Sequence, residues 1–181
     1  VLPAMRVLES DVYVYQFKIN AKASFGGDLW EWHQDFTFWQ REDGMPAPRA
    51  LNAVIFLDEV NEFNGPLYLI PGSHAEGAID SLADDKPLAS EVEPTYESSP
   101  GWINNLTANL KYALTNEVVG RLVAKYGLVA PKGRAGSILF FHSNLVHGSS
   151  NNISPFDRKT VIISFNSVQN LPVTTALPRP E

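Results

Sequence analysis

Two histidines, an aspartate and an arginine are the residues of this chain whose types and spacing point to chemistry. His33 and Asp35 are separated by one residue in an aromatic segment, and His147 lies far downstream. Because side chains alternate along a strand, His33 and Asp35 would share one face of a strand. Two imidazoles and one carboxylate form the triad that holds Fe(II) and leaves positions open for a cosubstrate and dioxygen. The pattern therefore predicts an Fe(II) site.

Arg158 follows the second histidine after a short loop and adds a binding group for an anion. Its planar guanidinium presents paired N–H donors that match the two oxygens of a carboxylate. A dicarboxylate cosubstrate needs such a group for the carboxylate that lies away from the metal. Together with the triad, Arg158 predicts a non-haem iron oxygenase that uses 2-oxoglutarate and dioxygen.

Zinc is the main rival of iron at a site with imidazole and carboxylate ligands. A zinc hydrolase would need a general base beside the metal, and the chain has no H-E-x-x-H motif. His74 ends a Pro-Gly-Ser turn and is expected to be structural. His142 lies five residues before His147, so on one continuous strand it would face the opposite side. A halogenase is disfavoured, because there a small residue replaces the carboxylate ligand, whereas Asp35 is present.

The composition is that of one globular domain with an acidic balance. The chain has 181 residues, and 44% of them are hydrophobic, which is enough for a sizeable core. The net charge of −6 argues against nucleic acid or an anionic membrane as a partner. The chain has no cysteine, which excludes disulfides and thiolate metal ligands. No signal-peptide pattern or membrane-spanning run is present, so we expect a cytoplasmic enzyme with a small-molecule substrate, and a homodimer.

Strand-like segments dominate the chain and are bounded by turn signals. They comprise residues 12–20, the segment that carries His33 and Asp35, and residues 50–57, 67–70, 137–141, 145–147 and 160–166. Four-residue spacing of apolar side chains predicts a helix within residues 104–126. The acidic, Pro- and Ser-rich stretch of residues 80–100 is expected to be an exposed loop or lid.

Many short strands around one helical insertion predict a mostly β fold, a double-stranded β-helix of the jelly-roll or cupin-like type with flanking helices. Residues 1–181 are expected to form a single Fe(II)/2-oxoglutarate dioxygenase domain, with the metal at the mouth of the barrel. Because the first residue is valine rather than methionine, we expect N-terminal residues, such as a helical layer, to be missing from this chain.

The segment from Trp32 to Pro46 resembles the signature F-x-W-H-S-D-F-E-T-W-H-x-E-D-G-M-P of ectoine hydroxylases, in the phytanoyl-CoA dioxygenase superfamily. Shorter matches lie in residues 15–20, 64–74, 130–133 and 147–158. The resemblance covers nearly the whole chain apart from the acidic stretch. It implies an Fe(II)- and 2-oxoglutarate-dependent hydroxylase of a small molecule.

The resemblance also implies roles for individual residues. His33, Asp35 and His147 match the iron ligands, and Arg158 matches the arginine that binds the distal carboxylate of 2-oxoglutarate. The residues assigned to the cosubstrate pocket are Asn20, Gln16, Ser149 and Trp30, the last in place of a phenylalanine. The residues assigned to the substrate pocket are Trp39, Ala50, Phe141, Ile162 and Lys18.

Departures from the family pattern bear on the choice of substrate. Gln34 replaces a serine, Lys18 falls where arginine is usual, and Ile162 appears where ectoine hydroxylases have phenylalanine. Loss of that ring removes one wall of an aromatic cage around a delocalised cation. We therefore expect a free amino acid or a close derivative to be a better substrate than ectoine.

Two other classes of function compete with a hydroxylase. A non-catalytic metal- or ligand-binding jelly-roll protein would share the fold, since fold does not determine function, but the intact triad and Arg158 argue against it. A metal-dependent isomerase or hydrolase of the cupin type generally presents more histidines than the two candidate ligands here. Release of succinate from 2-oxoglutarate, with and without iron, separates the three classes.

Overall fold

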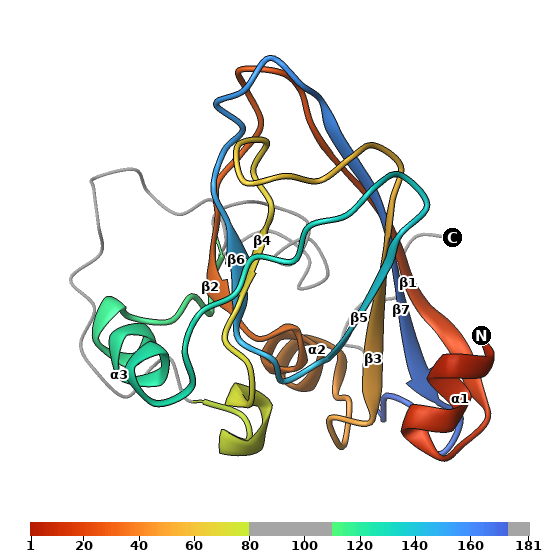
Figure 1. The fold of residues 1–181 in the computed structure, drawn as a ribbon. Helices are drawn as coiled ribbons and strands as arrows, with labels where there is room; N and C mark the ends of the chain where they lie inside the picture. The colour runs from red at the N-terminus through yellow and green to blue at the C-terminus, as the bar shows by residue number, and fades with distance from the viewer. Residues whose placement is uncertain (80–109, 174–181) are drawn as a thin grey trace.

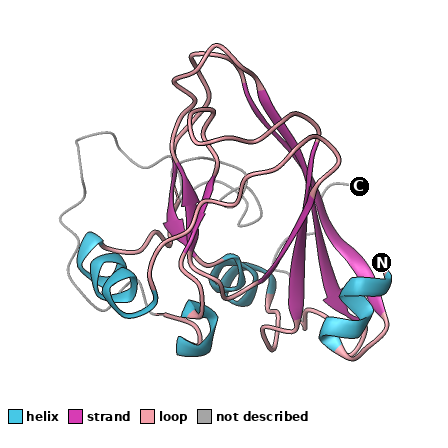
Figure 2. Ribbon diagram, in the orientation of Figure 1, coloured by secondary structure: helices cyan, strands magenta, loops and turns pink. Residues whose placement is uncertain are grey.

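Antiparallel β-sheets form most of the regular structure. The computed structural model of this chain describes residues 1–79 and 110–173, and within them seven strands form one sheet of four strands and one of three. Figure 1 shows the two sheets on opposite sides of the molecule, joined by long connections at one end, and Figure 2 shows the helices gathered at the other end. The expectation of a mostly β fold with flanking helices is confirmed.

The two sheets have different sizes, and every strand pairs antiparallel to its neighbours. The large sheet, in the order β1-β7-β3-β5, consists of β1 (Val12–Lys22), β7 (Arg158–Ser167), β3 (Ala50–Phe56) and β5 (Ile138–His142). The small sheet, in the order β2-β6-β4, consists of β2 (Trp30–His33), β6 (His147–Ser149) and β4 (Leu67–Leu69). Each predicted strand has a counterpart, although most differ by a residue or two at their ends.

The register of the large sheet places alternate side chains in rows across its inner face. Four successive rows are Gln16–Ser164–Asn52–Phe141, Lys18–Ile162–Val54–Leu139, Asn20–Thr160–Phe56 and Lys22–Arg158. Polar and charged side chains recur in these rows, which is unusual for a buried sheet face. The inner face is therefore built for a polar ligand as well as for packing.

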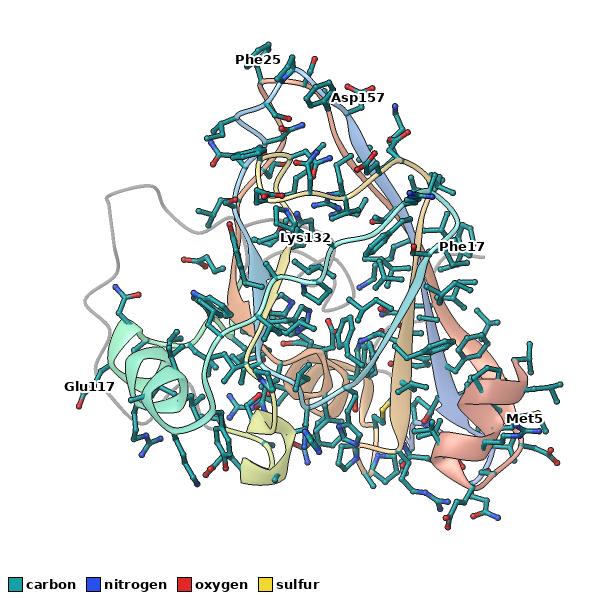
Figure 3. All side chains as sticks on the ribbon, viewed as in Figure 1. Met5, Phe17, Phe25, Glu117, Lys132 and Asp157 are labelled. Carbon is teal, nitrogen blue, oxygen red and sulfur yellow. The ribbon has the colours of Figure 1, made fainter. Side chains whose placement is uncertain are left out.

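The outer face of the large sheet is apolar and is partly covered by α1 (Leu2–Leu8). Ala4 and Leu8 of this helix pack in a cluster with Phe165 and other sheet residues. Beyond the helix the face is open, and Phe17, which is 62% exposed, projects away from β1 (Figure 3). Within residues 1–79 and 110–173, none of the helices has the length and apolar character needed to cross a bilayer.

Two further α-helices and a short 3-10 helix flank the sheets. They are α2 (Asp35–Asp43), η1 (Ser73–Glu76) and α3 (Asn116–Tyr126). Helix α2 ends at Gly44, whose φ of 68° lies in the left-handed region that favours glycine. Helix α3 begins after Thr115, whose side chain accepts a hydrogen bond from the Val118 N–H.

The predicted helix within residues 104–126 is wrong for residues 110–115, and residues 104–109 lie outside the described residues. Leu110 and Leu114 are buried in two different hydrophobic clusters rather than along one helix face. The Leu114 N–H donates to the Trp32 carbonyl (2.7 Å), so this stretch runs beside β2 instead. The acidic stretch expected to be a loop or lid also lies outside the described residues.

Candidate metal centre and anion pocket

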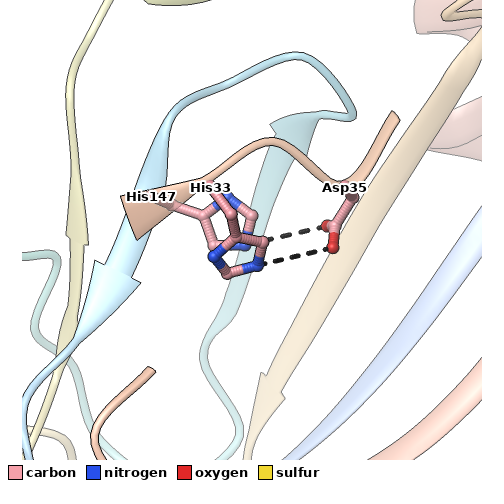
Figure 4. A group of neighbouring side chains, drawn as sticks. All are labelled: His33, Asp35 and His147. Atoms are coloured by element: carbon pink, nitrogen blue, oxygen red, sulfur yellow. Dashed lines mark ion pairs between the residues drawn. The ribbon is translucent and has the colours of Figure 1, made fainter. Parts of the chain in front are cut away.

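The structure brings His33, Asp35 and His147 together between the two sheets. His33 ends β2 and His147 begins β6, and the two residues are direct partners in the ladder, with ring centroids 4.2 Å apart. Asp35 approaches from the start of α2 (Figure 4). One donor atom from each of the three residues lies within 4.8 Å of the others.

The prediction that His33 and Asp35 share a strand is wrong. The strand ends at His33, Gln34 occupies the N-cap position with an extended backbone, and Asp35 is the first residue of α2. A carboxylate in the first turn is favoured by the positive end of the helix dipole. The two side chains nevertheless converge, because the chain turns at Gln34 and carries Asp35 across toward the large sheet.

Backbone carbonyls orient both histidine rings. Nδ1 of His33 lies 2.6 Å from the Glu31 carbonyl, and Nδ1 of His147 lies 2.9 Å from the Leu145 carbonyl. Because a carbonyl only accepts, each Nδ1 must carry the proton and donate it. In the neutral ring, Nε2 then carries no proton and offers its lone pair on the side of Asp35. This is the tautomer that a metal ligand requires.

The charge states of these groups also suit a cation. Burial, and next the neighbouring His147, lower the pKa of His33 to about 3, so its ring is neutral at ordinary pH. Burial alone would raise the pKa of Asp35, but the neighbouring His147, Lys18 and His33 and the hydrogen bond from Asn52 outweigh it and lower that pKa. Nε2 of each histidine lies 3.7 Å from a different Asp35 oxygen, too far for a hydrogen bond. Two imidazoles and a carboxylate fit a divalent metal such as Fe(II) or Zn²⁺.

Arg158 lies on the inner face of β7 and is only 2% exposed. Its Nη1 donates to Asn20 Oδ1 (2.7 Å) and Thr160 Oγ1 (3.3 Å), and its Nη2 donates to the Gly65 carbonyl (2.8 Å). Its Nε is buried and has no partner among the described residues. Burial lowers the pKa of Arg158 to about 10, which still leaves the guanidinium charged at neutral pH. A buried cation with an unused donor is suited to an anionic ligand.

Lys22 is a second buried cation beside Arg158, and sequence reasoning missed it. It is 1% exposed, and its Nζ donates to the Asp28 carbonyl (2.7 Å), to Ser149 Oγ (2.9 Å) and to the Ser150 carbonyl. Burial, and next the charge of Arg158, lower the pKa of Lys22 to about 7. Lys22 follows Asn20 by two residues on the same strand, so strand alternation predicts that both side chains lie on the same face.

Close packing holds the two cations in place. Gly65, whose carbonyl accepts from Arg158, has a φ of +72°, and a Cβ there would lie 2.9 Å from the Ser150 carbonyl oxygen and 3.0 Å from Lys22 Cδ. Only glycine fits this position. In the part of the chain that the structure describes, neither Lys22 nor Arg158 forms a salt bridge with a carboxylate. Arg158 therefore carries a positive charge that a bound anion would neutralise.

A single cavity of about 140 Å³ connects the candidate metal centre and Arg158. The predicted site residues that line it are His33, Asp35, His147, Arg158, Asn20, Ser149, Trp30, Phe141, Ile162 and Lys18. Residues that line it without having been predicted include Phe38, Asn52 and Thr160.

Three predicted residues are not among those that line this cavity. Trp39 and Ala50 are fully buried in a hydrophobic cluster with Phe36 and Met45. Gln16 is paired with Ser164 one row beyond Ile162, and its Oε1 is buried without a partner among the described residues. Trp39 Nε1 is likewise buried and unpartnered there.

The remaining histidines and Gln34 lie around the centre. The rings of His142 and His74 lie with their centroids 5.4 Å apart and tilted by 40°, and they are not part of the three-residue group. Burial, and next His74, lower the pKa of His142. Gln34 is buried, its Nε2 donates to the carbonyls of Gly77 and Asn144, and its Oε1 accepts from the Ile79 N–H. Gln34 therefore fixes the turn between His33 and Asp35.

Comparison with known proteins agrees with this architecture. An L-proline trans-4-hydroxylase from Streptomyces griseoviridis is 42% identical over 97% of this chain and 62% of its own length. An ectoine dioxygenase from Nocardia farcinica is 39% identical over 98% of this chain and 56% of its own length. The chain thus spans less than two thirds of either relative.

A solved structure and a family model identify the fold and the family. The crystal structure of EctD from S. alaskensis with 2-oxoglutarate and 5-hydroxyectoine superimposes with a TM-score of 0.74 at 34% identity, covering 98% of this chain and 53% of that one. The double-stranded β-helix predicted from the sequence is thereby confirmed. The family model for phytanoyl-CoA dioxygenase (PhyH) matches residues 1–160. The chain belongs to the phytanoyl-CoA dioxygenase family.

Proposed function

We propose that this protein is an Fe(II)- and 2-oxoglutarate-dependent hydroxylase of a small molecule. The observation that carries the proposal is one cavity lined at one end by His33, Asp35 and His147 and at the other by Arg158. A metal site alone would fit many proteins. A buried guanidinium with an unused N–H, placed in the same cavity as three metal donors, matches a dicarboxylate that binds the metal with one end.

The proposed roles of the residues follow from their positions. His33, Asp35 and His147 hold the metal, and Arg158 binds the distal carboxylate of 2-oxoglutarate, with Asn20 and Thr160 orienting the guanidinium. Lys22 supplies a second positive charge behind Ser149. When bound, iron with 2-oxoglutarate and dioxygen supplies the oxidising power for hydroxylation of a C–H bond. The protein contributes ligand geometry, cosubstrate orientation and a largely buried cavity.

We propose a free amino acid, including an imino acid such as L-proline, as the substrate class. Lys18 lines the cavity and lies close enough to Asp35 to lower its pKa, so a cation is present beside the metal centre. A substrate carboxylate would interact favourably with it. Ile162 lines the cavity where a phenylalanine would favour a delocalised cation. The relatives named for L-proline and ectoine support small, zwitterionic substrates.

Anaerobic metal loading followed by turnover tests the proposal. The protein reconstituted with Fe(II) should release succinate from 2-oxoglutarate in air, faster with L-proline than with ectoine, and the product should gain one oxygen by mass. The matched control is the Arg158→Met protein loaded with the same metal. Iron binding without succinate release would favour the alternative, a non-catalytic metal-binding jelly-roll protein.

The net charge of −6 supports a small molecule rather than nucleic acid as partner, and no described helix could span a membrane. A cytoplasmic location and a homodimer stay predictions, and fractionation and light scattering of the protein would test them.

A further inference from the structure

Asn52 is a fully buried side chain at the centre of the large sheet, and it faces the candidate metal centre. It lies on β3, between Ser164 of β7 and Phe141 of β5, and its exposed fraction is 0%. Its Nδ2 donates to Asp35 Oδ2 (2.7 Å). Its Oδ1 accepts from the Ser164 hydroxyl (2.6 Å). The amide therefore links the carboxylate of the centre to a second buried polar side chain.

The chemistry of the partners fixes which way the amide points. An ionised carboxylate only accepts hydrogen bonds, so the NH2 group of Asn52 must face Asp35. Its carbonyl oxygen must then face Ser164, whose hydroxyl has to donate. Reversing the amide would place two acceptors against each other at Asp35. Asp35 thus selects the orientation of the Asn52 amide, and the Ser164 hydroxyl holds the carbonyl end of that amide in place.

The two oxygens of Asp35 are left in unequal states. Oδ2 accepts from Asn52, whereas no hydrogen bond to Oδ1 is found within the described residues. Both oxygens lie equally near a histidine, Oδ1 3.7 Å from His33 Nε2 and Oδ2 3.7 Å from His147 Nε2, so the Asn52 hydrogen bond is what distinguishes them. A hydrogen-bonded oxygen is a poorer metal ligand than a free one, and the bond also fixes the plane of the carboxylate.

We propose that Asn52, oriented by Ser164, is a positioning residue that makes Asp35 bind the metal through Oδ1 alone. The inference rests on the proposed function. With three protein donor atoms, positions remain for both oxygens of the cosubstrate end and for dioxygen. A carboxylate that bound through both oxygens would take one of these positions. Asn52 would therefore keep these positions free for the cosubstrate and dioxygen, and it would also increase the affinity for the metal.

Metal and cosubstrate binding, measured without turnover, test this role. Co(II) is titrated anaerobically into the wild type, Asn52→Leu, Ser164→Ala and the double variant, and 2-oxoglutarate is then titrated into each Co(II) protein. For Asn52→Leu we expect Co(II) affinity to fall about 10- to 100-fold, as for other residues that orient metal ligands. Cosubstrate affinity on the loaded protein should fall as well, with a changed Co(II) visible spectrum.

The Ser164→Ala variant, a smaller change, keeps the test decisive if Asn52→Leu does not fold. It should weaken Co(II) binding about 2- to 10-fold, the value of one lost hydrogen bond. In the double variant the serine change should add nothing, because Ser164 acts through Asn52. The matched control is Asn166→Leu on the same strand, whose amide bonds Tyr13 and Asn170 instead. It should leave Co(II) affinity unchanged.

The outcomes separate this inference from the proposed function. If the wild type binds neither Co(II) nor Fe(II), the proposed function fails. If the wild type binds metal and turns over, but Ser164→Ala and every folded Asn52 variant keep Co(II) affinity and spectrum within about twofold, Asn52 has no positioning role. Additive losses in the double variant would also overturn the relay through Ser164.

Discussion

Replacing Arg158 with lysine should weaken 2-oxoglutarate binding while keeping a positive charge in the pocket. The guanidinium uses three of its N–H groups on Asn20, Thr160 and Gly65, and its Nε–H is unpartnered among the described residues. The Nε and Nη2 edge of the fork can therefore meet a carboxylate side-on with two parallel hydrogen bonds. An ammonium group on a shorter, unbranched stem can supply only one bond in the same direction.

The magnitude follows from the lost bond. A hydrogen bond to a charged group contributes about 1.5–3 kcal/mol, and each 1.4 kcal/mol is about tenfold in affinity. Arg158→Lys should therefore raise the dissociation constant of 2-oxoglutarate about 10- to 150-fold. Lysine also leaves the acceptors on Asn20 and Gly65 poorly satisfied, which adds to the loss.

Anaerobic titration of 2-oxoglutarate into the metal-loaded protein measures this change without turnover. Lys159→Gln is the matched control, because Lys159 on the same strand pairs with Asp157 and Asp58 at the surface. The control should bind 2-oxoglutarate like the wild type. If Arg158→Lys also binds like the wild type, the distal carboxylate lies elsewhere, and Lys18, which also lines the cavity, becomes the candidate anchor.

Three further changes probe the rest of the site. Asp35→Ala should abolish hydroxylation and reduce metal affinity by on the order of 100-fold or more, since it removes a ligand outright; equilibrium dialysis with Fe(II) under argon would show retained iron if the assignment is wrong. The metal-free protein should gain stability as the pH rises from about 7 toward 10.5, because the folded pKa of Lys22 is about 7, below its ordinary value of 10.5, so the unfolded chain binds more protons in that window. Urea unfolding across this range should show the free energy of unfolding rising with pH for the wild type and rising less for Lys22→Met. Equal slopes for the two proteins would contradict this role of Lys22. Ile162→Phe should shift the ratio of turnover with ectoine over L-proline upward by about 2- to 30-fold, equivalent to ~0.5–2 kcal/mol of cation–π attraction; an unchanged ratio in competition assays would mean that this side chain does not contact the substrate.

The strands were predictable from the sequence because burial on a two-faced sheet imposes alternation. In β1 the alternation of Phe17 and Ile19 with Lys18 and Asn20 separates an exposed apolar face from a polar inner one. The alternation therefore predicts the strand, even though the polar face of the strand is the one that faces the interior. The reversal arises because the inner face lines the cavity of the candidate site and the outer face is left open beyond α1.

Helix α2 was not predictable from local preference. Phe36, Thr37, Phe38 and Trp39 are four consecutive buried residues of aromatic or β-branched type, a run that favours a strand. All four side chains are buried because the helix packs between the sheets. Tertiary contacts therefore override the preference of these residues for a strand. His33 and Asp35 are therefore neighbours, as predicted, but Asp35 lies on helix α2 and not on the strand that the sequence led us to expect.

Lys22 shows a different reason for failure. Lysine is almost never buried without a partner, so a sequence reading assigns it to the surface by default. Here three oxygen acceptors surround the ammonium group, and they come from segments that meet only in the folded chain. No local pattern contains that information, although the period-two spacing from Asn20 indicated the correct face.

The in-register pairing of His33 with His147 would give a bound metal a mechanical role. The two residues are more than a hundred positions apart in the chain, and the ladder between β2 and β6 is short. A metal held by both histidines and Asp35 is therefore a removable cross-link that closes a long loop. Because the three donors come together only in the folded chain, metal binding would add its own binding free energy to the stability of the fold. Iron limitation would then lower the lifetime of the folded protein as well as its activity, so that cellular iron supply would control how much of this chain persists.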